Sequence, residues 1–370
     1  MKSSIPIYSL TALCVLASCI DRFEPEGTAS QESILTVDGV ITSGITTVEL
    51  NRTIPMDMEW SKAPPVDDAI LYVECDDGAR FTRTSYLGDG LYEIETGELH
   101  PGKQYRLHIG LDGRTYESGY LPPLFSPGID SISYQKREAG APVYITVSTH
   151  DETDGPSYYR WTYRENWEFK SELFAEYGKL NGYGPDTYFD LNTANNIYYC
   201  WGSNQSRSFV LAATDKLSQN IISHKRLTEI PPGSEKISEL YHIAVSQYRI
   251  RKEAHDYFAN QQKNVSQTGG IFSPVPAEMK GNIHCLTAPG EWVIGYVEVS
   301  VPSVKEQFMP ELTLVYEPPP ETCNLLISSS SYTGITYMLG PPPLYAPSRC
   351  LDCTLRGTKN KPPFWPTSHL

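Results

Sequence analysis

The sequence predicts a mainly β protein, with an immunoglobulin-like β-sandwich near its N-terminal end and a larger β-rich domain after it. Three observations support this class. Short stretches of alternating apolar and polar residues recur at intervals of roughly 8 to 15 residues. Asp-Gly and glycine-rich turns separate them. Tyrosine outnumbers phenylalanine 25 to 11, beside 29 prolines and 27 glycines, a balance typical of turn-rich sheets.

Residues 1–18 predict an export signal rather than part of the fold. Lys2 precedes an apolar run over residues 5–17, which is too short to span a bilayer. The run ends in Leu16-Ala17-Ser18-Cys19, the spacing at which a bacterial signal peptidase cuts before a cysteine that receives lipid. We therefore expect the mature chain to begin at Cys19 and to be held to a membrane by fatty chains on that residue. An ordinary secretory peptide cut elsewhere is the alternative.

Residues 19–31 are predicted to form a lipidated tether. Acidic residues follow the cysteine at Asp21, Glu24 and Glu26, and small polar residues come next. An acidic leader after the lipid resembles the surface-export signal of Bacteroidota lipoproteins. The alternative is a solvated linker with no export role.

Charge and length restrict the remaining possibilities. The net charge of −14 at pH 7 argues against nucleic acid or anionic lipid as the main partner. The mature chain is longer than one hydrophobic core usually serves, so two domains are expected. No stretch after Cys19 approaches 18 consecutive apolar residues, so we expect no membrane-crossing helix there.

The first domain is predicted over residues 32–126, followed by a stiff proline-containing connector. Its expected strands share apolar–polar alternation and glycine-containing turns, as an immunoglobulin-like sandwich requires. They include residues 33–41, 46–50, 69–75, 92–94 and 105–109.

The second domain is predicted over residues 127–370, with one or two helices. Its expected strands include residues 129–134, 143–147, 159–163, 239–250 and 291–300. The clearest helix is expected over residues 251–261, where Ala254, Tyr257 and Phe258 share one stripe with Gln261. Residues 318–366 form a proline-rich tail with little periodicity.

The pair Cys350 and Cys353 forms a C-x-x-C motif, which suits a redox centre, a zinc site or disulfides. A redox pair needs its first cysteine at a helix N-terminus, whereas prolines precede this one. A zinc site needs two more ligands, which Cys200 and Cys323 could supply. An oxidising compartment makes disulfides the simpler use of the same four cysteines.

We predict two bridges among Cys200, Cys323, Cys350 and Cys353, with Cys350 and Cys353 not joined to each other. A loop of roughly 30 residues from Cys323 to either of them stabilises by about 3.5 kcal/mol, whereas a link across two residues constrains almost nothing. The bridges would staple the tail to the second domain.

Cys75 and Cys285 are predicted to lie in different domains and to be free, buried thiols. A disulfide between the two domains is the alternative.

The remaining motifs predict no catalytic, cofactor-binding or metal-binding residue. The aromatic run over residues 158–169 could stack on sugars or grip a peptide, but its alternation favours a core strand. Glu165 and Glu168, three apart, are no evidence of a glycosidase pair. The eight histidines are scattered, and no H-E-x-x-H motif, phosphate loop or dinucleotide fingerprint is present. We expect no cofactor.

Several segments occur in a recognisable order along the chain. They are LTVDGVIT at 35–42, Gly90-Leu91-Tyr92, PGKQYRLHI at 101–109, DGRTYES at 112–118, YYRW at 158–161, CW at 200–201, QY at 247–248, GNI at 281–283, CLDC at 350–353 and KPPFW at 361–365. Together they resemble the domain of unknown function 4249 family of Bacteroidota outer-membrane lipoproteins. The resemblance implies a surface-exposed lipoprotein encoded beside a TonB-dependent receptor, and it implies no established reaction.

The sequence therefore leads us to expect a non-catalytic outer-membrane lipoprotein, exposed on the cell surface. It would act as an accessory or ligand-capture subunit of a TonB-dependent receptor in nutrient uptake. A stand-alone surface hydrolase or adhesin is the alternative. The sequence leaves the ligand open among a glycan, a peptide, a siderophore-like chelate and none at all.

Overall fold

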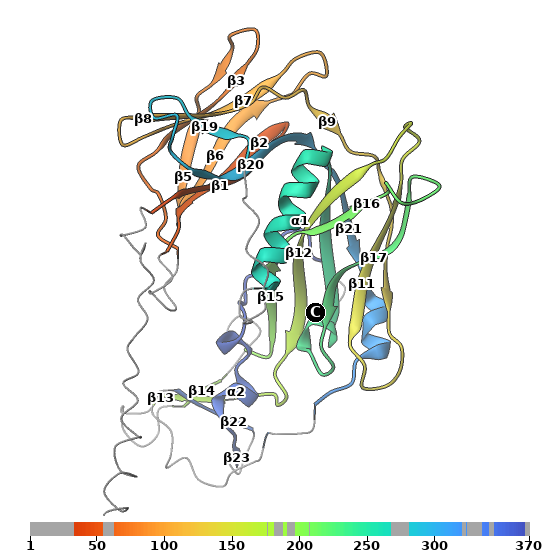
Figure 1. The fold of residues 1–370 in the computed structure, drawn as a ribbon. Helices are drawn as coiled ribbons and strands as arrows, with labels where there is room; N and C mark the ends of the chain where they lie inside the picture. The colour runs from red at the N-terminus through yellow and green to blue at the C-terminus, as the bar shows by residue number, and fades with distance from the viewer. Residues whose placement is uncertain are drawn as a thin grey trace, which may run out of the picture.

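The computed structural model confirms a mainly β fold with two packed units (Figure 1). It describes residues 33–54, 63–175, 177–180, 188–190, 197–206, 208–267, 281–319, 323, 335–339 and 344–366. The predicted signal and the tether with Cys19 lie outside these ranges. Within them, no helix has the length and apolar character needed to cross a membrane.

Two sheets form the first unit, which lies at the top of Figure 1. The six-stranded sheet has the order β5-β6-β2-β1-β20-β9. Its strands are β1 (Leu35–Ile41), β2 (Gly44–Arg52), β5 (Thr84–Gly88), β6 (Leu91–Gly97), β9 (Leu124–Phe125) and β20 (Val293–Val301). The five-stranded sheet contains, in order, β19 (Ile283–Cys285), β8 (Arg114–Ser118), β7 (Tyr105–Leu111), β3 (Ile70–Cys75) and β4 (Arg80–Phe81).

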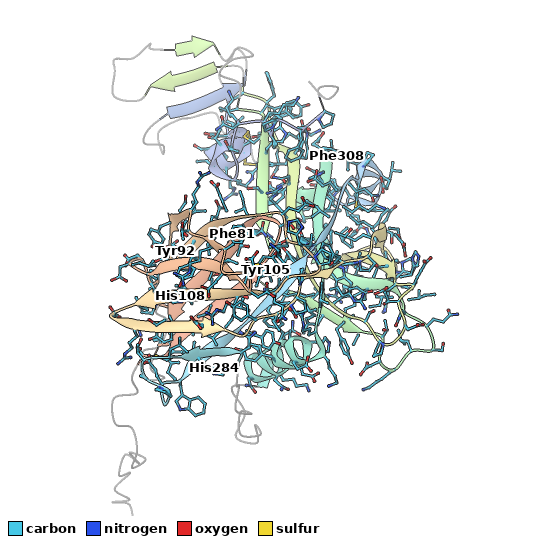
Figure 2. All side chains as sticks on the ribbon, turned by 90° about the horizontal axis from the view of Figure 1, so that it is seen from above. Phe81, Tyr92, Tyr105, His108, His284 and Phe308 are labelled. Atoms are coloured by element: carbon cyan, nitrogen blue, oxygen red, sulfur yellow. A yellow bond between two sulfur atoms is a disulfide. The ribbon has the colours of Figure 1, made fainter. Side chains whose placement is uncertain are left out.

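The two sheets share one buried core, to which β1 contributes Leu35 and β7 contributes Leu107. Tyr92 and Tyr105, marked in Figure 2, belong to the same core. Apolar residues at every second position of the strands supply this core and leave the alternate positions on the outer faces. The first unit is therefore sandwich-like.

Strands from late in the chain complete the first unit. β20 lies parallel to β1, with register from Leu35 opposite Val293 to Ile41 opposite Val299. β19 pairs with β8. The first unit therefore does not end at residue 126, the boundary expected from the sequence. Residues 283–301 also fold with it. Without β20, β1 would be an edge strand with unpaired backbone groups.

The parallel pairing also departs from an immunoglobulin-like sandwich, whose sheets are antiparallel. The apolar run of β20 indicated a strand in the sequence. The sequence of β20 did not indicate that β1 is its neighbour, because the apolar pattern of a strand does not depend on which strand it pairs with.

Two further sheets form the second unit. The five-stranded sheet holds β15 (Tyr199–Gln205), β12 (Tyr158–Lys170), β18 (Leu240–Ile250) and β21 (Ser303–Phe308) in that order, and β16 (Val210–Ala213) also pairs with β12. The three-stranded sheet holds β10 (Ile129–Gln135), β11 (Val143–His150) and β17 (Ile221–Ile230). Tyr159 and Trp161 are fully buried in the core that these sheets share, so the expectation of a core strand there is confirmed.

The predicted helix is confirmed as α1 (Lys252–Gln267). Ala254, Tyr257 and Phe258 are its buried stripe, and they pack with Tyr158 of β12 and Tyr296 of β20. Because those two strands belong to different units, the stripe joins the units. Figure 1 shows α1 beside β12, below β20.

Short elements make up the rest of the described chain. They are the 3₁₀ turns η2 (Glu235–Ile237), η3 (Pro310–Val315) and η4 (Cys353–Leu355), the helix α2 (Ser348–Leu351), and a small sheet of β14 (Tyr188–Asp190), β13 (Tyr177–Leu180), β22 (Ile335–Leu339) and β23 (Leu344–Tyr345). The tail therefore holds more regular structure than its sequence periodicity indicated.

The predicted bridges form as Cys200–Cys353 and Cys323–Cys350. This pairing rules out a zinc site built from the same four thiols. Cys75 and Cys285 are free and buried, as predicted. They lie in the same core rather than in different domains, because β19 belongs to the first unit.

Candidate functional site

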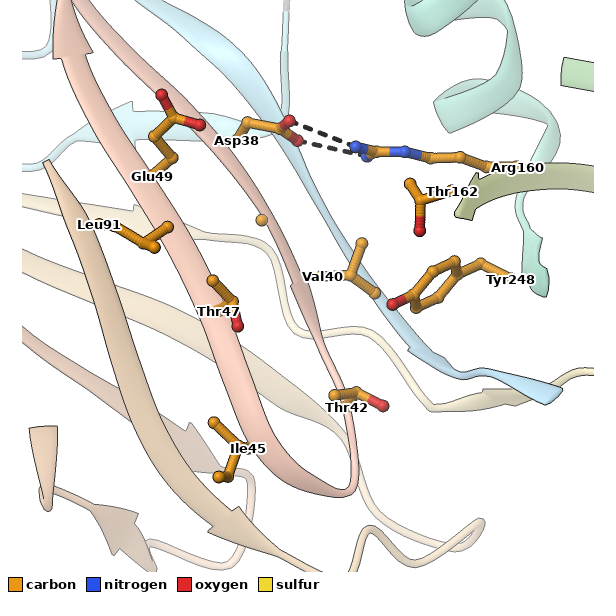
Figure 3. A pocket seen from close by; sticks show the side chains of 11 residues that line it. Asp38, Val40, Thr42, Ile45, Thr47, Glu49, Leu91, Arg160, Thr162 and Tyr248 are labelled. Atoms are coloured by element: carbon orange, nitrogen blue, oxygen red, sulfur yellow. Dashed lines mark hydrogen bonds and ion pairs between the residues drawn. The ribbon is translucent and has the colours of Figure 1, made fainter. Parts of the chain in front are cut away.

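Two cavities lie side by side where the first unit meets the second, and we call them together the groove. Their volumes are about 220 Å³ and about 230 Å³, and both are lined by Asp38 and Glu49. The first is also lined by Gly39, Val40, Thr42, Ile45, Thr47, Leu91, Arg160, Thr162 and Tyr248 (Figure 3). The second is also lined by Thr36, Val37, Asn51, Tyr257, Phe258, Gln261, Ile294, Gly295 and Tyr296.

One wall of the groove is the outer face of β1 and β2. In β1, Leu35 and Val37 point into the sandwich core, and Asp38 is exposed. In β2, Val48 is buried and Glu49 is exposed. The period of two therefore gives this face its polar side chains, and the same alternation buries the apolar ones.

Asp38 and Glu49 lie directly opposite each other in the antiparallel pairing of β1 with β2. Like charges in this position on one face of a sheet destabilise it. Among the described residues, Glu49 forms no ion pair; its carboxylate accepts a hydrogen bond of 2.7 Å from the Asn51 amide. The groove thus contains two carboxylates at opposed positions, one of which has no ion partner in the described part of the chain.

The facing wall supplies Arg160 from β12. Its Nη1 and Nη2 each donate a hydrogen bond of 3.2 Å to one oxygen of Asp38. The guanidinium lies 4.5 Å from the ring centre of Phe209 and 4.6 Å from that of Phe258. Arg160 is only 7 % exposed, and its buried Nε has no acceptor among the described residues. The two rings and Asp38 hold the guanidinium in place.

Tyrosines line both cavities, Tyr248 the first and Tyr257 and Tyr296 the second. Burial raises the pKa of Tyr248, and in the second cavity burial raises the pKa values of Tyr257 and Tyr296 to about 12. All three hydroxyls therefore stay protonated at neutral pH and can donate hydrogen bonds. Figure 3 shows the Tyr248 hydroxyl directed toward Val40 across the first cavity.

A buried ion pair fixes α1 against the first unit. Glu298 of β20 is fully buried and accepts a hydrogen bond of 2.9 Å from the backbone nitrogen of Arg251. The Arg251 guanidinium also bonds the Glu298 carboxylate. Burial raises the pKa of Glu298, against the effect of the neighbouring guanidinium. This contact sits at the start of α1 and so positions Tyr257 and Phe258 at the groove.

The cysteines predicted as site residues do not line the groove. Cys200, Cys350 and Cys353 are buried at the tail, and Cys323 lies beside them. Cys19, the predicted lipidation site, lies outside the described residues. Among the described residues, no group of three or more His, Cys, Asp or Glu side chains could hold a metal ion.

Glu165 and Glu168, for which no role was predicted, make structural contacts. Glu165 is fully buried and bonds Lys236 at 2.7 Å and Tyr241 at 2.8 Å. Glu168 accepts a hydrogen bond of 2.9 Å from the indole of Trp365 and so anchors the tail to β12.

Sequence reasoning missed the groove because its key contact joins residues 122 positions apart. The only signal was indirect. Asp38 lies in the LTVDGVIT segment and Arg160 in the YYRW segment, and both segments carry the family resemblance. Their pairing follows from the packing of the two units and cannot be read from either segment.

The model of a family described as domain of unknown function DUF4249 matches residues 20–306. The match covers more than half of the chain and includes Asp38, Glu49 and Arg160, and it stops before the disulfide-bonded tail. No curated protein matches the chain. The chain therefore belongs to the DUF4249 family.

Proposed function

We propose that this chain is a non-catalytic surface lipoprotein of the outer membrane that captures a ligand as an accessory subunit of a TonB-dependent receptor. The observation that carries the ligand-capture role is the groove, since both units contribute polar side chains to it. Ligand sites occur preferentially at such junctions, where a few placed polar groups set orientation. The lipidation sequence ending at Cys19 and the acidic residues after it support the location.

The size of the groove favours a small ligand or one protruding group of a larger ligand. Each cavity is smaller than the roughly 300 to 1,000 Å³ of sites for drug-sized molecules. A single sugar ring or one amino-acid side chain fits this range. The shared lining by Asp38 and Glu49 lets one ligand extend into both cavities.

One observation favours the alternative of a surface hydrolase. Asp38 and Glu49 are opposed carboxylates in a groove, and retaining glycosidases use two carboxyls about 5 Å apart. Two features argue against it. Both oxygens of Asp38 already accept hydrogen bonds from Arg160, and both carboxylates belong to one wall rather than flanking a bond from two sides.

Activity assays on the purified protein separate binding from catalysis. The proposal expects no cleavage of glycans or peptides above the background of the Glu49→Gln variant. Cleavage that is lost in Glu49→Gln, with folding intact by thermal unfolding, would move the chain to the hydrolases.

Fractionation tests the location. The Cys19→Ala variant should leave the outer-membrane fraction, because the lipid is the only anchor that we propose. Protease added to intact cells should remove the wild-type protein if it faces outward. A variant that stays in the membrane after salt washing, or a wild type that protease reaches only after lysis, would contradict the respective part of the proposal.

A further inference from the structure

We propose that the groove binds a protonated amine, held between the carboxylates of Asp38 and Glu49. This inference rests on the proposed ligand-capture function and gives it a chemical class. The amine would belong either to a small molecule or to a lysine side chain of a bound peptide.

The charge arrangement is the first argument. Asp38 and Glu49 occupy directly opposite positions on neighbouring strands, and Arg160 balances the charge of only one of them, Asp38. A cation placed between them would remove the repulsion and pair with the carboxylate that lacks an ion partner among the described residues. Charge-assisted hydrogen bonds from an ammonium to carboxylates are among the stronger polar contacts in proteins.

A comparison on the same sheet strengthens this argument. Glu95 of β6 is also exposed on the six-stranded sheet, and Arg83 pairs with it at 2.7 Å. Within the described ranges, Glu49 has an amide partner and no cationic one. Of the two acids that line both cavities, Glu49 is therefore the one available to pair with an incoming cation.

The surroundings of the carboxylates are the second argument. The ring of Tyr248 lines the first cavity, and the rings of Tyr257 and Tyr296 line the second. Aromatic faces attract ammonium groups, so these rings favour a cation over a neutral group.

Ligand titration followed by nuclear magnetic resonance tests the inference on the full folded chain. The probes are Nα-acetyl-lysine amide and Nα-acetyl-norleucine amide, which differ in the terminal ammonium. We expect the lysine probe to bind with a dissociation constant of about 1 mM and the norleucine probe to bind at least roughly tenfold more weakly. Glu49→Gln should raise the dissociation constant of the lysine probe roughly tenfold. Glu95→Gln, the matched control on the same sheet, should leave this constant unchanged.

A second pair of probes distinguishes the sources of the amine. The capped peptide Gly-Gly-Lys-Gly-Gly is compared with Nα-acetyl-lysine amide. If peptides are the source of the amine, the peptide should bind more tightly. If a small molecule is the source, the peptide should bind no more tightly. Equal binding of the lysine and norleucine probes, or no effect of Glu49→Gln, would overturn the inference. Copurification with a receptor is a separate experiment. A failed amine test would therefore contradict the amine proposal without contradicting the receptor-associated function.

Discussion

Arg160 of β12 donates two hydrogen bonds of 3.2 Å to Asp38 of β1, and this bidentate pair joins the two units beside the groove. The stacking of Phe209 and Phe258 on the guanidinium adds contacts that lysine could not reproduce. The pair therefore both links the units and shapes the wall of the binding site.

Replacing Arg160 with methionine should lower the free energy of unfolding by about 1 to 3 kcal/mol. The variant keeps an apolar stem but loses the pair and the stacked guanidinium. Urea unfolding measures the change. The matched control is Arg83→Met, which breaks the exposed pair with Glu95 and should cost less than about 1 kcal/mol. Equal losses in the two variants would show that Arg160 is not a link between the units.

Replacing Gly295 with alanine should disrupt the parallel pairing of β20 with β1. A Cβ at Gly295 would lie 2.2 Å from the carbonyl oxygen of Val37, and the φ of +154° is one that side chains rarely adopt. We expect a loss of about 2 to 4 kcal/mol in unfolding free energy. Gly290→Ala, where a Cβ meets nothing within 4 Å, is the control. An undisturbed Gly295→Ala would contradict the parallel pairing.

Glu74 should make stability depend on pH in the acid range. Hydrogen bonds from Arg106, with help from Arg80 and Tyr120, lower the pKa of Glu74 from 4.5 to about 2. Because the folded state favours the carboxylate, this contribution is fully present above about pH 4.5 and is lost as pH falls toward 2. We expect this site to contribute about 3 kcal/mol to the free energy of urea unfolding across that window. Glu74→Gln should reduce the slope, because other carboxylates with lowered pKa values still contribute to it, and Glu95→Gln should retain it in full.

The two disulfides should contribute unequally. Cys200–Cys353 closes a loop of 153 residues and Cys323–Cys350 one of 27, which correspond to about 5 and about 3.5 kcal/mol in the chain-entropy model. Paired serine substitutions of each bridge, compared by unfolding and by limited proteolysis of the tail, measure the difference. We expect faster cleavage of the tail without Cys200–Cys353. The reverse order would show that the tail is held by other contacts.

Local patterns predicted what depends on local structure. The alternation of Leu35, Val37 and Ile41 predicted a strand, and the stripe of Ala254, Tyr257 and Phe258 predicted α1. Both patterns bury apolar residues on one face, and that requirement is visible in a short window of sequence.

Contacts between distant segments could not be predicted in the same way. The sequence of β20 indicated a strand, but its place beside β1 depends on the whole chain returning to the first unit. The pair of Asp38 with Arg160 depends on the same return, since α1 and β20 bring the two units together. The tail cysteines were a partial exception, because excluding a link between Cys350 and Cys353 left two pairings of the four cysteines, and the structure forms one of them.

Affinity purification from native membranes tests the central proposal, a receptor-associated binding protein, most directly. The tagged protein would be extracted in mild detergent, and the proteins that accompany it would be quantified by mass spectrometry. We predict one dominant β-barrel receptor in near-equal amount, since a lasting accessory subunit needs a large complementary interface. Recovery of the protein alone, with no receptor above the level of an untagged control, would contradict the proposal.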